Sequence, residues 1–80
     1  MKFRVKKEYI DGERTYDVRD CPVAKAIKDT FPHRKIIVDY EFIKIGRKYY
    51  SMPKNVERFI RRYDAHKPCR SITFELPIGE

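Results

Sequence analysis

The chain has 80 residues and a net charge of +7 at pH 7, from 19 Lys and Arg side chains against 12 Asp and Glu. Its length fits one small domain spanning residues 1–80, and its 41% of hydrophobic residues exclude a disordered basic tail. The longest apolar runs are three residues, which excludes a membrane span, and charged residues interrupt any candidate secretory signal. With only two cysteines, these features predict a cytoplasmic protein.

The excess positive charge lies in one stretch of the sequence. Between residues 44 and 70 there are nine bases and two acids, whereas the rest of the chain holds ten bases and ten acids. A local positive field of this kind attracts nucleic acid, nucleotides, anionic lipid headgroups or an acidic protein face. A solvated surface that keeps a small domain soluble is the alternative interpretation.

Residues 2–10 alternate between apolar and charged side chains, which is the pattern of a half-buried strand. The dipeptide Asp11-Gly12 favours a type I′ hairpin turn, because both central residues of that turn need a positive φ. Residues 15–18 would form the returning strand. We therefore expect the chain to begin with a β-hairpin.

The sequence predicts a short helix after this hairpin. Asp20 stands where an N-cap is expected, Pro22 falls in the first turn, where a missing N–H costs nothing, and Pro32 ends the helix. One helical stripe is formed by Val23, Ala26, Ile27, Thr30 and Phe31. This stripe is the face that we expect to pack on the sheet.

Residues 35–45 are a β-branched and aromatic run, which predicts one long strand or two strands with a break near Asp39-Tyr40. Gly46-Arg47 suits a type II′ turn, with glycine at the first central position, and residues 48–51 would return as the partner strand. The alternation assigns one side of the run to Ile36, Val38, Tyr40 and Phe42.

The clearest helix in the sequence follows this hairpin. Its apolar positions have the i, i+3, i+4, i+7 spacing and are Val56, Phe59, Ile60 and Tyr63. Ser51 or Asn55 would cap its start, and Pro53 lies nearby. Alternation over residues 72–76 then predicts a final strand.

The order of these elements predicts an α+β fold: an antiparallel sheet of about four to six strands with two short helices packed on one face. The core is thin, because each buried apolar side chain contributes about 1.5–3 kcal/mol against ordering costs of similar total size. Dimerisation would enlarge this core, so a homodimer is one expectation that the sequence leaves open.

The candidate binding site lies in the basic stretch. The candidate residues for binding an anion or nucleic acid are Arg47, Lys48, Arg58, Arg61 and Arg62. Arginines so close on one helix could follow a phosphate backbone or hold an acidic partner bidentately. Tyr49 or Tyr50 beside these cations would be a stacking platform, although one of the two must face inward. A plain solvated face is the alternative for the arginines.

Several common motifs of enzyme active sites are absent from the sequence. The three glycines cannot form a phosphate-binding loop, and neither H-E-x-x-H nor G-x-S-x-G occurs. A zinc site can be imagined from Cys21, His33, His66 and Cys69, but the spacing is unlike that of a zinc knuckle. We therefore predict no catalytic residue, metal or cofactor. A small metal-free nuclease, with His66 as a base beside Asp64 and an arginine, is the catalytic alternative.

Four segments of the chain carry a resemblance. They are Cys21-Pro22-Val23-Ala24-Lys25-Ala26, then Ile45-Gly46-Arg47-Lys48-Tyr49 with Pro53, then Val56-x-x-Phe59-Ile60-x-x-Tyr63-Asp64, and finally Phe74-x-Leu76-Pro77. Over residues 20–77 this pattern resembles a family of small bacteriophage proteins without an established activity. The resemblance implies a phage origin and expression in a bacterial host cytoplasm, where small basic phage proteins bind nucleic acid or host proteins.

Together these observations predict a non-catalytic, phage-type basic protein that engages an anionic partner through residues 44–70. The partner would be nucleic acid, a nucleotide or an acidic host-protein surface, and not a membrane. The alternative is a protein–protein inhibitor of a bacterial defence or transcription component, acting through strand edges and apolar surface. Binding to a phosphate backbone weakens steeply with salt, whereas binding through an apolar interface does not.

Overall fold

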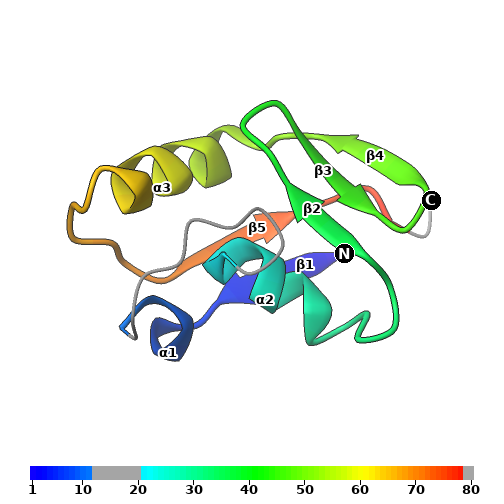
Figure 1. Ribbon diagram of the computed structural model, residues 1–80, viewed down its shortest axis with the longest axis horizontal. Coiled ribbons are helices and arrows are strands. Elements are labelled where there is room, and N and C mark those ends of the chain that lie inside the picture. Colours follow the sequence, from blue (N-terminus) through cyan, green and yellow to red (C-terminus); the bar gives the residue numbers. More distant parts are fainter. Residues whose placement is uncertain (12–20, 79–80) are drawn as a thin grey trace.

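Residues 1–11 and 21–78 are described by the computed structural model, and they form an α+β fold with two antiparallel sheets (Figure 1). In chain order the elements are β1 (Lys2–Val5), α1 (Lys7–Ile10), α2 (Pro22–Lys28), β2 (Ile36–Val38), β3 (Phe42–Ile45), β4 (Lys48–Ser51), α3 (Lys54–Asp64) and β5 (Ile72–Glu75). Strand β1 pairs with β5, and β2, β3 and β4 form the other sheet. The predicted α+β class is confirmed, but the strands divide between two sheets instead of joining in one.

The N-terminal strand is shorter than its alternation predicts. Strand β1 ends at Val5, and Lys7–Ile10 form the helical turn α1. The helical turn buries Ile10, whereas Tyr9 is only half-buried and donates a hydrogen bond from its hydroxyl to the carboxylate of Asp29. The predicted continuation of the strand to residue 10 is therefore wrong. The rest of the predicted hairpin, from Gly12 to Val18, lies outside the described residues, as does the predicted cap Asp20.

The N-cap residue of α2 is Cys21, so the predicted N-cap one residue earlier is wrong. The Cys21 Sγ accepts a hydrogen bond from the backbone N–H of Ala24 at 3.5 Å. Pro22 occupies the first helical position, as predicted. The helix ends at Lys28, before the predicted stop at Pro32. Its apolar stripe packs against β1 and β2, so that one core cluster joins both sheets.

The three-stranded sheet is formed by two hairpins. A break at residues 39–41 separates β2 from β3, and Gly46 has a φ of 61°, as the first central position of a type II′ turn requires. The break also shifts the alternation by one residue. Ile43 and Ile45 are buried, whereas Phe42, which the alternation places on the same side as the buried Ile36 and Val38, is only half-buried.

Helix α3 packs against β5 and begins after Pro53, which makes no side-chain cap. The two predicted caps are absent: Asn55 lies within the helix, and its Nδ2 donates to the backbone oxygen of Thr73 in β5 at 2.9 Å. The buried side chains of α3 are Val56, Phe59 and Tyr63, as the spacing predicts, whereas Ile60, the fourth predicted position, is only half-buried. No helix among the described residues is long and apolar enough to cross a membrane.

The C-terminal end of α3 is closed by two reverse hydrogen bonds. The N–H of Lys67 donates to the oxygen of Arg62 at 2.9 Å, and the N–H of His66 donates to that of Tyr63 at 3.2 Å. This is the Schellman arrangement, and it places His66 in the left-handed region with a φ of 59°. The chain thereby turns sharply and returns along the helix toward β5.

Candidate anion-binding groove

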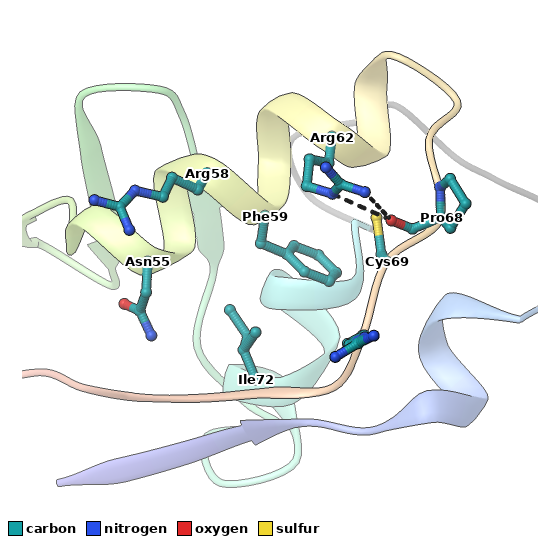
Figure 2. A pocket seen from close by; sticks show the side chains of 8 residues that line it. Asn55, Arg58, Phe59, Arg62, Pro68, Cys69 and Ile72 are labelled. Atoms are coloured by element: carbon teal, nitrogen blue, oxygen red, sulfur yellow. Dashed lines mark hydrogen bonds between the residues drawn. The ribbon is translucent and has the colours of Figure 1, made fainter.

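A groove of about 480 Å³ lies between α3 and the segment that returns from it to β5 (Figure 2). On the α3 side it is lined by Asn55, Arg58, Phe59 and Arg62, and on the other side by Pro68, Cys69, Arg70 and Ile72. The helical residues have the i, i+3, i+4, i+7 spacing, so they share one face of α3. We call this feature the arginine groove.

Arg62 connects the two walls of the arginine groove. Its Nε and one terminal nitrogen donate to the backbone oxygen of Pro68 at 3.2 and 3.0 Å, as the dashed lines in Figure 2 show. A carbonyl oxygen carries no net charge, so these bonds position the guanidinium without neutralising it. The same bonds hold the returning segment beside the helix, and this segment contributes Arg70 to the groove.

The positive charge of the arginine groove is not balanced by acids. None of its lining residues is acidic, and within the described part of the chain neither the Arg58 nor the Arg70 side chain forms an ion pair or a hydrogen bond. Arg58 and Arg62 lie one helical turn apart, about 6 Å along the axis. Like charges at this spacing destabilise a helix by roughly 0.2–0.5 kcal/mol, and a bound anion would relieve that repulsion.

Arg61 belongs to a different face of α3. Its guanidinium forms an ion pair with Glu57 one turn earlier at 3.0 Å and lies 5.6 Å from the centre of the Tyr40 ring. The hydroxyl of Tyr40 in turn donates to Asp64, and this hydrogen bond raises the pKa of the tyrosine. The charge of Arg61 is therefore already compensated, unlike that of its neighbours in the groove.

The other predicted cations lie away from the arginine groove. Arg47 is in the turn between β3 and β4, and Lys48 begins β4. This turn is at the right end of the molecule in Figure 1, whereas α3 runs into its returning segment at the left end. The structure therefore brings together only Arg58 and Arg62 of the five predicted residues.

The two candidate stacking residues face opposite sides of β4. Tyr50 is half-buried and packs against the core, whereas Tyr49 is 63% exposed. Its ring meets Phe42 edge-on, with 5.2 Å between centroids, and the Nζ of Lys44 lies 5.2 Å from the ring centre. Tyr49 is the accessible member of the pair, but it does not line the arginine groove.

Sequence reasoning missed Arg70 as a site residue, because it attached no role to the segment from Lys67 to Arg70. The available indication was the short connection after a long helix, which has to run back along that helix to reach the final strand. The same connection brings Cys69 to the groove wall, with its Sγ donating to the oxygen of Lys67 at 3.4 Å. Cys21 is instead the cap of α2, and burial raises the pKa of its thiol.

Within the described part of the chain, no three His, Cys, Asp or Glu side chains are grouped so that they could hold a metal ion. No family model, curated protein or solved structure matches the chain. The resemblance to bacteriophage proteins therefore stays a prediction. The class that the fold and the groove define is a small α+β protein with an uncompensated cluster of arginines.

Proposed function

We propose that this protein is a non-catalytic binding module whose arginine groove engages the phosphate backbone of nucleic acid. The observation that carries the proposal is that Arg58, Arg62 and Arg70 all line one groove that has no acidic lining residue, with the Arg58 guanidinium directed away from Arg62 along the helix (Figure 2). Guanidinium groups hold phosphates bidentately, and contacts to the backbone position a protein on nucleic acid without reading its sequence. A phage origin and a bacterial cytoplasmic location are part of the same proposal and rest on the sequence resemblance.

The test is a titration of labelled single-stranded and duplex oligonucleotides at several salt concentrations. The three phosphate contacts of the arginine groove predict a log–log slope of about −2.7 on duplex and contribute about −2.1 to the slope on a single strand. Arg58→Gln and Arg70→Gln should each make the slope shallower by about 0.7–0.9, because each variant removes one contact. A partner such as a free nucleotide would compete with the oligonucleotide for the same groove.

The matched control is Arg61→Gln, which removes the same charge from the adjacent, compensated face of α3. It should leave the salt slope unchanged. Equal losses in all three variants would show that only the total charge matters, and the absence of salt-dependent binding would refute the proposal.

A second candidate function is binding to a protein through the edge of β4. The two-residue turn makes Ile45 and Lys48 a hydrogen-bonded pair, so the backbone groups of Tyr49 and Ser51 point away from β3. Among the described residues, none forms a hydrogen bond with these outward-facing backbone groups. An open edge of this kind can accept a strand from a partner, as a host-protein inhibitor would use it. Binding of that kind would depend little on salt.

A further inference from the structure

The outer face of the three-stranded sheet carries an apolar and cationic row. Ile37 of β2 pairs in register with Lys44 of β3, and Lys44 pairs with Tyr49 of β4. Their neighbours along each strand, such as Ile36, Ile43 and Ile45, point into the core, so this row points outward. We call this face, with Phe42 beside Tyr49, the sheet platform.

A second basic hollow adjoins the sheet platform at the edge of β2. This hollow has a volume of about 270 Å³ and is lined by Lys28, Arg34, Lys35, Ile36 and Ile37. Ile37 belongs both to the hollow and to the row, so the two features are continuous. None of the lining residues is acidic, whereas the acids Asp39 and Glu41 lie in the turn at the opposite end of β2.

Tyr49 is the aromatic side chain best placed for an external contact on this face. It is 63% exposed, and its two described ring contacts, to Phe42 and Lys44, come from the adjacent strand. An exposed ring beside cations combines the two elements of single-strand recognition, a surface for stacking a base and charges for the phosphates. In a duplex the faces of the bases are covered by their neighbours, so only an unpaired base can use such a ring.

We infer that the sheet platform binds single-stranded nucleic acid, with a base stacked on Tyr49 and phosphates held by Lys44 and the basic hollow. The inference rests on the proposed function and deepens it, because it names the strandedness of the nucleic acid. The arginine groove binds the phosphate backbone of both single-stranded and duplex nucleic acid, whereas the sheet platform adds affinity only for unpaired bases.

The experiment compares Tyr49→Ala with the unchanged protein on single-stranded and duplex oligonucleotides of equal length. Loss of one stacked base should weaken single-strand binding by about 5- to 150-fold and leave duplex binding within twofold. Tyr49→Phe keeps the ring and should bind like the parent. Tyr40→Ala is the matched control, because this second exposed tyrosine is engaged with Asp64 on α3.

Photocrosslinking gives an independent measurement, since an oligonucleotide with 5-iodouracil crosslinks to an aromatic ring stacked on it. The expected crosslink is to Tyr49, located by peptide mass spectrometry. If Tyr49→Ala lowers single-strand binding less than twofold while Arg58→Gln still weakens binding, the sheet platform is refuted and the proposed function stands. If neither form of nucleic acid binds, both are refuted.

Discussion

The left-handed conformation of His66 leads to a quantitative prediction about the end of α3. At the position that follows the C-cap of a helix, glycine is the usual residue because it lacks a Cβ atom. His66 occupies this position with a φ of 59°, while both reverse hydrogen bonds of the motif are formed. The substitution His66→Gly should therefore stabilise the protein without changing its backbone.

The conformational part of this change follows from two opposing backbone terms. The left-handed conformation costs a residue with a Cβ about 1–2 kcal/mol, whereas glycine loses about 0.5–1 kcal/mol more conformational free energy on folding than alanine does. The difference between the midpoints of these two ranges predicts a gain in the free energy of unfolding of about 0.75 kcal/mol. For a domain of this size, such a gain raises Tm by about 3–6 °C. His66→Asn should change the stability little, because asparagine and histidine both occur in this region more often than most other residues.

The assay is urea denaturation followed by circular dichroism, together with thermal melts of the same samples. Ala65→Gly is the matched control, because Ala65 has a φ of −85° and gains nothing from glycine. It should lower the free energy of unfolding by about 0.5–1 kcal/mol. If His66→Gly is neutral or destabilising while Ala65→Gly behaves as expected, the conformational reasoning is wrong.

Two further predictions concern the walls of the arginine groove and the cysteines. Arg62→Gln removes both hydrogen bonds to Pro68 and should lower the free energy of unfolding by about 0.5–1.5 kcal/mol. Arg62→Gln should also weaken nucleic-acid binding more than Arg58→Gln does, because Arg70 is then no longer held in place. Equal weakening by the two variants would contradict this. Iodoacetamide should alkylate Cys69 before Cys21, because burial shields the Cys21 thiol and raises its pKa. Peptide mass spectrometry at successive times gives the order, and faster reaction of Cys21 would mean that the start of α2 opens readily.

Local patterns in the sequence predicted much of the fold. The spacing of the apolar residues identified α3, and Gly46 identified the β3–β4 turn, because both depend on interactions between residues close in sequence. The division into two sheets was not predictable in this way, because β1 pairs with β5 across almost the whole chain. The alternation alone also could not reveal that the break at residues 39–41 would bury Ile43 in place of Phe42.

The candidate site was predictable only in part for the same reason. The pairing of Glu57 with Arg61 follows an i, i+4 pattern that can be read from the sequence, and it separates Arg61 from the site. The contribution of Arg70 depends on the path of the chain after α3, which no local pattern specifies. A run of basic residues in the sequence is therefore not one surface in space: here it supplies residues to the groove at one end and to the β3–β4 turn at the other.

Two features of the groove end of α3 act against the stability of the helix. Arg58 and Arg62 repel each other at i, i+4, at roughly 0.2–0.5 kcal/mol, and His66 adds the strain described above. Sequences tend to depart from locally favourable choices where function requires it. The same repulsion matters for the binding test, because Arg58→Gln relieves it and should leave the protein slightly more stable. A loss of nucleic-acid binding in that variant would then be a loss of contact and could not be attributed to unfolding.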